Sequence, residues 1–311
     1  MTANQDITMA GSAITSANGG ELLYDAGRNI NVGLVQATNV SLNAGGDITD
    51  SRRDLITNIR ATNLRMVAGG AIGDSDSGSA ASVNTRAIDT EVVNLAAASA
   101  NGTHIQEVIV RDIAAVTVTV SVDQAKFNST SRTVTETTTL SGLADLATTS
   151  NGDIKLVAAN GSITIQDGPT GVTNASNQIG VSAHGTGDVL LEARGNGSDV
   201  VVNANILSGV GHITLNAGDD IDLNSALSTG GTGTVYLLAS NGSSDLSGVE
   251  VDGINLDAGI TTADGDVLIH SMRDIRQTSS VTSGSGDVGL IAGRNIEQTA
   301  TGHITTTTGD V

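Results

Sequence analysis

The sequence predicts an all-β fold, a parallel β-helix (solenoid) built from coils of roughly twenty-odd residues. Three observations predict this class. A short phrase with alternating apolar residues recurs along most of the chain, turns rich in Gly, Asn and Asp follow it, and no stretch shows the 3.6-residue apolar period of a helix. Pro occurs once and aromatic residues make up 1% of the chain, whereas β-branched residues are plentiful. The expected core is therefore made of Val, Ile, Leu and Ala.

The recurring phrase is clearest in VSLNAGGDI, which begins at Val40. Close copies begin at Leu22, Leu64, Ile213, Val267 and Val288, and looser copies at Val93, Ile154, Val189 and Val235. Successive copies start 18 to 35 residues apart, except for one gap of 61 residues that follows Val93. Each copy is expected to mark one coil of three short strands and three turns.

Within the phrase, Val40, Leu42 and Ala44 point to one side and the residues between them to the other, which is the period of a strand. A second short strand follows the turn, beginning at Ile48, Ile163, Ile221 or Ile296. A lone coil cannot bury its inward residues. Stacking coils about 4.8 Å apart pairs every strand with its neighbours and joins the interiors into one column. A dozen or so coils would give a rod roughly 60 Å long.

We expect one elongated segment over residues 1–311, with an insertion or loop excursion at about 106–150 inside the 61-residue gap. The piece VIVRDIAAVTVTVSVDQAKF alternates well enough to form one or two further coils. The Thr-rich piece TSRTVTETTTLSGLADL is expected to be a projecting hairpin or loop, and the sequence leaves both alternatives open. Contacts with a partner are predicted there, with Phe127, Arg132 and Glu136 as candidates.

Composition excludes several classes of function. The net charge of −19 and the presence of only two Lys argue against nucleic acid as a partner. The absence of Cys excludes disulfides and thiolate metal sites. No apolar run approaches the ~20 residues of a transmembrane helix, and the first residues lack the pattern of a secretory signal. If the protein is exported, we expect its signal to lie outside this segment.

The repeated VSLNAGGDI phrases and the TSGSGDV-type linkers resemble the repeat regions of filamentous-haemagglutinin-like adhesins. These are very large bacterial surface proteins that are exported by two-partner secretion or related routes. The resemblance extends from Leu22 to Val311 and is weakest between Val108 and Leu146. It implies a right-handed parallel β-helix that serves as a stalk or adhesive surface, with no catalytic residues.

The same resemblance implies an extracellular or cell-surface location. The expected partner is a host or neighbouring cell surface that presents a glycan or protein receptor. The family's export domain carries Asn-Pro motifs, whereas the single Pro here follows Gly168. We therefore expect an internal segment, flanked by further repeats of the same parent chain.

Calcium is the one cofactor that the sequence suggests. Gly-Asp recurs at one register of three consecutive coil boundaries, which aligns Asp266, Asp287 and Asp310. Stacked carboxylates repel one another, and Ca²⁺ takes carboxylate and carbonyl oxygens as ligands. The alternative is that these residues cap turns through their own backbone, as Asp commonly does. The sequence predicts no other cofactor.

A stand-alone carbohydrate-active enzyme is the alternative function, because polysaccharide lyases and hydrolases share the β-helix architecture. Such enzymes need clustered carboxylates or basic groups in a groove, usually with aromatic residues that stack on sugars. An aromatic content of 1% argues against such a sugar-binding groove. We expect a protein that is not an enzyme.

Overall fold

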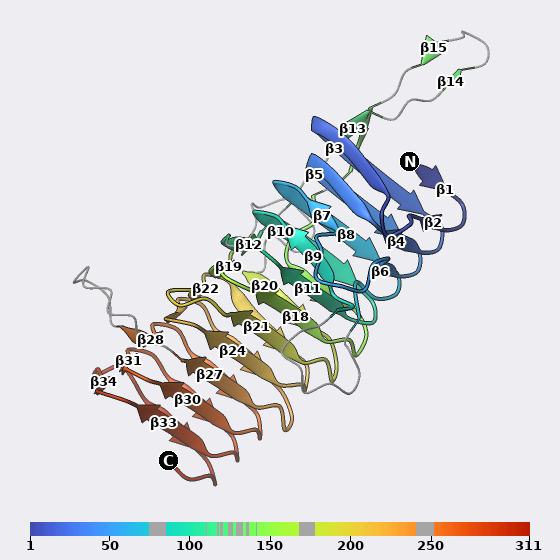
Figure 1. Ribbon diagram of the computed structural model, residues 1–311. Coiled ribbons are helices and arrows are strands. Elements are labelled where there is room, and N and C mark those ends of the chain that lie inside the picture. The colour runs from blue at the N-terminus through green and yellow to red at the C-terminus, as the bar shows by residue number, and fades with distance from the viewer. Residues whose placement is uncertain are drawn as a thin grey trace.

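A computed structural model confirms the all-β parallel β-helix (Figure 1). It describes residues 1–74, 85–109, 111–116, 118, 121–123, 127–128, 133–134, 137–140, 142–167, 178–240 and 252–311. None of these residues lies in a helix. Figure 1 shows the coils stacked in chain order, from the N-terminus at one end to the C-terminus at the other.

The first ten strands form what we call the N-terminal block, residues 1–99. They are β1 (Thr2–Ala3), β2 (Ile7–Thr8), β3 (Ile14–Ala26), β4 (Ile30–Val32), β5 (Leu34–Ala44), β6 (Ile48–Asp50), β7 (Ile59–Arg60), β8 (Asn63–Ala68), β9 (Ile88–Glu91) and β10 (Asn94–Ser99). In this block β3, β5, β8 and β10 stack on one face, each parallel to the next.

The strands from residue 146 onward form the C-terminal block. One face stacks β17 (Leu146–Thr148), β20 (Ile179–Ala183), β23 (Asn205–Ser208), β26 (Leu227–Thr229), β29 (Ile260–Thr262), β32 (Val281–Ser283) and β35 (Ile304–Thr306). A second stacks β18 (Ile154–Ala158), β21 (Val189–Ala193), β24 (Ile213–Ala217), β27 (Val235–Ala239), β30 (Val267–Ser271) and β33 (Val288–Ala292). The third stacks β19 (Ile163–Ile165), β22 (Val200–Val202), β25 (Ile221–Leu223), β28 (Gly253–Leu256), β31 (Asp274–Gln277) and β34 (Ile296–Gln298).

The inward residues form one apolar column that continues through both blocks. Leu191, Leu215 and Leu237 lie one above another in β21, β24 and β27, and all three are fully buried. The column joins residues from Ile7 to Val288 in a single cluster. The third inward position of the phrase is a buried Ala in Ala26, Ala44, Ala68, Ala158, Ala193 and Ala217. A small residue is favoured there because the strand reaches a corner of the narrow interior.

Between the blocks, β11 (Thr103–Glu107) and β12 (Ile113–Ala115) remain in the stack, on β9 and β10 respectively. The chain then leaves the stack as an antiparallel excursion. β13 (Ser121–Asp123) pairs with β16 (Thr137–Thr139), and β14 (Phe127–Asn128) pairs with β15 (Thr133–Val134). Figure 1 shows β14 and β15 projecting away from the coils, with β13 beside β3. Of the described residues in the alternating piece, 108–127, those of β12 lie in the stack, whereas β13 and the first residue of β14 already belong to the hairpin.

The region from β10 to β12, which we call the junction, shifts the faces of the solenoid. Residues 94–95 of β10 pair with β12, and residues 97–99 of β10 pair with β17. The face that contains β10 therefore divides into two faces. β11 pairs with β9 on one side and with the whole of β18 on the other. As a result the phrase occupies the β3–β5–β8–β10 face before the junction and the β18–β21–β24 face after it. The copy assigned to Val93 also begins two residues later, because Leu95 lies on Leu64.

Candidate functional site

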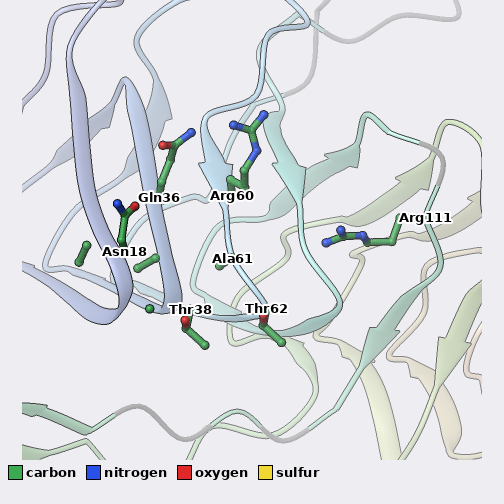
Figure 2. A pocket seen from close by; sticks show the side chains of 10 residues that line it. Asn18, Gln36, Thr38, Arg60, Ala61, Thr62 and Arg111 are labelled. Carbon is green, nitrogen blue, oxygen red and sulfur yellow. The ribbon is translucent and has the colours of Figure 1, made fainter.

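A concave surface, which we call the groove, lies on the N-terminal block beside the junction. Its volume is about 400 Å³, and it is lined by Ala17, Asn18, Gly19, Gln36, Ala37, Thr38, Arg60, Ala61, Thr62 and Arg111. β3 and β5 change register between Ala17 and Glu21, and Gly19 has φ of 69°, which favours glycine. Figure 2 shows Asn18, Gln36 and Arg60 on successive coils, with Arg111 reaching in from the segment before β12.

The two guanidinium groups of the groove differ in their pairing. Arg60 forms a bidentate ion pair with Glu91, with both N–O distances at 2.6 Å. Hydrogen bonding across this pair raises the pKa of Arg60 and lowers the pKa of Glu91. Arg111 is exposed, and it forms no ion pair with any residue that the structure describes. On a chain of net charge −19, this groove therefore offers hydrogen-bond donors and the positive charge of Arg111, which no described residue pairs.

The groove suits binding better than acid–base chemistry. Its lining residues, among those that the structure describes, include neither a carboxylate nor an aromatic side chain. Glycoside hydrolysis generally needs a pair of carboxylates that flank the scissile bond. Amide and guanidinium donors instead suit a ligand rich in hydroxyl, carboxylate or sulfate oxygens.

Two fully buried carboxylates lie at the edge of the junction, Asp89 in β9 and Glu107 in β11. Burial raises the pKa of Asp89 to about 8, and the charges of Asp50 and Asp54 add to the shift. Burial likewise raises the pKa of Glu107 to about 7, although its Oε2 accepts two hydrogen bonds from the β9 segment, at 2.9 and 3.0 Å. The fold thus encloses acidic groups where the stack changes faces.

Asp145 is a third buried carboxylate, placed just before β17. It is 1% exposed, its φ is 74°, and neither of its carboxylate oxygens accepts a hydrogen bond from a described residue. Burial raises the pKa of Asp145 to about 7, and the charge of Asp167 adds to the shift. Asp tolerates this left-handed backbone better than most residues, which explains its presence at the point where the chain re-enters the stack.

The residues predicted as a calcium column take part in a ladder of hydrogen bonds between coils. Asp266 Oδ1 accepts the backbone N–H of Asp287 at 2.8 Å, and Asp287 Oδ1 accepts that of Asp310 at 2.8 Å. Asp153 and Asp188 make the same contact one coil apart, at 2.9 Å. These bonds account for the recurrence of Asp at this corner, because each carboxylate caps the turn of the next coil. Calcium binding at this column stays a prediction.

Converging carboxylate oxygens occur elsewhere. Among the described residues, the two groups with carboxylate oxygens within 4.8 Å of one another are Asp50 with Asp54 and Asp89, and Asp199 with Asp219 and Asp220. Neither group contains a residue of the predicted column. The first of the two lies where the N-terminal block meets the junction.

The predicted partner-contact loop is described only in part. Phe127 lies in β14 of the hairpin, whereas Arg132 and Glu136 lie outside the described residues. Sequence reasoning missed the groove, since Arg60 and Arg111 are 51 residues apart and share no motif. It also missed a ladder of side-chain amides, in which Asn63 donates to Asn39 and Asn94 to Asn63, both at 2.7 Å. The sequence did contain a signal for this ladder, because an Asn directly precedes each of three neighbouring copies of the apolar pattern.

Comparisons of the chain with protein-family models, with curated proteins and with solved structures find no match. In the described part of the chain, no helix of the length and apolarity needed to cross a membrane is present.

Proposed function

We propose that this chain is a structural and adhesive stalk segment of a very large secreted bacterial surface protein that mediates cell adhesion or cell–cell contact. The observation that carries the proposal is the parallel ladder between coils, which extends through both blocks to β35. A fold of this kind gives length and stiffness, because every strand is held by the strands of the coils before and after it. The repeat phrases, which resemble those of filamentous-haemagglutinin-like adhesins, support the same proposal.

Adhesion requires surface features that differ from coil to coil, and the chain has two of them on one end of the rod. The groove presents Arg111 and several amide donors, and the hairpin of β13 to β16 projects beyond the coils. Both lie on or next to the N-terminal block. We propose that a glycan or protein receptor on a host or neighbouring cell is bound there.

An immunoblot of intact cells and culture medium, with antibody raised against this segment and with added surface protease, tests the proposal. We expect a very large band that disappears when intact cells are treated with protease. A soluble cytoplasmic band of the size of these 311 residues alone would contradict it, and screens for glycan degradation would then be the next experiment.

A further inference from the structure

Three carboxylates from two successive coils converge beside the junction. Asp50 ends β6, Asp54 lies in the loop between β6 and β7, and Asp89 lies in β9 of the following coil. One oxygen of each lies within 4.8 Å of the others. Asp50 and Asp89 are 39 residues apart in the sequence and meet only because the coils stack. We call this group the acidic triad.

Asp89 is the member that most requires a partner. Its side chain is fully buried, and neither carboxylate oxygen accepts a hydrogen bond from a described residue. The backbone fixes its position, since Asp89 N–H donates to Asn58 Oδ1 at 2.9 Å and Asn58 N–H donates to the Asp89 carbonyl at 2.8 Å. Burying a carboxylate without a hydrogen bond or a positive charge is strongly unfavourable. The carboxylate nevertheless faces two others.

The loop between β6 and β7 is built around Asp50. Its Oδ1 accepts hydrogen bonds from Arg52 N–H at 2.8 Å and from Asn58 Nδ2 at 2.6 Å, and its Oδ2 accepts one from Arg53 N–H at 2.5 Å. Arg53 has φ of 55°, so the chain turns sharply here. This turn brings Asp54 back toward Asp50. The donors fix the orientation of the Asp50 carboxylate within the triad.

No basic side chain neutralises the triad among the residues that the structure describes. The Arg52 guanidinium donates through Nε to the carbonyl of Gly11, and the Arg53 side chain is exposed. Arg60, the next basic residue in the chain, is held by Glu91. Three carboxylates at this spacing repel one another strongly in a partly buried site. A bound cation would offset this repulsion.

We propose that Asp50, Asp54 and Asp89 bind one divalent cation, and that Ca²⁺ fits the site best. Ca²⁺ accepts about six to eight oxygen ligands in flexible geometry, whereas Mg²⁺ requires near-ideal octahedral geometry and gives up its waters reluctantly. Asp54 is only partly buried, so water has access to complete the coordination shell. The ion would tie the β6–β7 loop to the next coil. This site is separate from the Asp266–Asp287–Asp310 column.

Isothermal titration of the full 311-residue chain with CaCl2, together with thermal unfolding in CaCl2 or EDTA, tests the proposal. We expect one site per chain and a higher melting temperature in calcium. Asp54→Asn and Asp89→Asn should each weaken binding by about tenfold or more, because affinity follows the number of ligand charges. Asp287→Asn is the matched control, since its amide oxygen retains the hydrogen bond to Asp310 N–H. It should bind calcium as the unmodified chain does.

Comparing the two triad variants distinguishes the loss of a calcium ligand from the loss of the folded structure. In EDTA, Asp89→Asn should unfold at the same or a higher temperature than the unmodified chain, because it replaces a buried carboxyl that has no hydrogen bond from a described residue. If Asp89→Asn does not fold, Asp54→Asn decides the question. Absence of both heat and a melting shift at about 5 mM CaCl2, above the range of extracellular calcium modules, would overturn the proposal. Binding that survives Asp54→Asn and Asp89→Asn but is lost in Asp287→Asn would overturn it as well.

Discussion

The C-terminal block and the junction are built from the same kind of strand, yet they fill their interiors differently. In the C-terminal block, the inward column is apolar, and the buried polar side chains at its corners include hydroxyls with a nearby acceptor. Ser208 donates to the Gly187 carbonyl at 2.9 Å, and Thr229 donates to the Gly211 carbonyl at 2.6 Å. At or beside the junction, the buried polar groups also include the carboxylates Glu107 and Asp145, whereas the C-terminal block buries one carboxylate, Asp219, among its described residues.

The difference follows from register. Where each coil repeats the one before it, every inward position lies on an equivalent position, and an apolar residue satisfies all of them. At the junction, β10 pairs with both β12 and β17 on one side, and β11 lies between β9 and β18, so inward and corner positions no longer coincide. The irregular stacking then encloses polar side chains that a regular coil would place at its surface. Predictions that change one region and not the other test this distinction.

The largest effect is expected in the regular column. Leu215→Ala removes a fully buried side chain between Leu191 and Leu237 and should lower the free energy of unfolding by about 2–5 kcal/mol. Thr214→Ala, on the outward side of the same strand, should change it by less than about 0.5 kcal/mol. Urea unfolding followed by circular dichroism measures both. Equal effects of the two substitutions would contradict the assignment of inward and outward positions.

The junction should make stability depend on pH. The folded pKa values of Glu107 and Asp145 are about 7, whereas unfolded carboxyls titrate near pH 4. Between these values the folded state binds more protons than the unfolded state, so the free energy of unfolding should fall as pH rises from about 5 to 8. Urea titrations at the two pH values measure the change.

Asp145→Asn should remove part of that dependence. It should stabilise the chain by a few kcal/mol at about pH 8 and change it little at about pH 5, since one pKa unit corresponds to about 1.4 kcal/mol. Asn also tolerates the left-handed backbone at this position. Asp167→Asn should give a smaller change in the same direction, because the charge of the exposed Asp167 contributes only part of the shift in the pKa of Asp145. A chain that is equally stable at both pH values, before and after Asp145→Asn, would show that Asp145 is not buried as a charged group.

The ladder of hydrogen bonds between coils, formed by Asp266, Asp287 and Asp310, should contribute less to the free energy of unfolding. Asp287→Ala removes the acceptor of Asp310 N–H, and we expect a loss of about 0.5–1.5 kcal/mol of unfolding free energy. Asp287→Asn keeps an oxygen in that place and should cost less than about 0.5 kcal/mol. Thermal melts in EDTA compare the two without any contribution from calcium. A larger loss in the Asn variant would assign the role to the charge and not to the hydrogen bond.

The smallest effect on stability is expected at the groove. Arg111→Ala should leave the melting temperature nearly unchanged, because Arg111 is exposed and forms no ion pair with a described residue. It should weaken retention of the chain on an immobilised sulfated glycan. Arg28→Ala, which changes another exposed Arg that does not line the groove, is the matched control. Equal retention of both variants would argue against the groove as a contact site.

Much of the solenoid could be predicted from the sequence because its physics is local and repeated. Alternation placed Val40, Leu42 and Ala44 inside, and the second strands do begin at Ile48, Ile163, Ile221 and Ile296. The face shift could not be predicted, since it depends on which strands meet across a 61-residue gap. For the same reason the acidic triad was missed, because nothing near Asp89 in the sequence indicates that Asp50 lies beside it.

Native-state hydrogen exchange, resolved strand by strand in EDTA, tests most directly whether the junction is the weak point of an otherwise continuous stack. The amides of β21, β24 and β27 should exchange last, because regular coils hold them on both sides. The amides of β10, β11 and β12 should exchange earlier, in one cooperative step with β17. Equal protection along the whole rod, or slowest exchange at the junction, would contradict this comparison of the two regions.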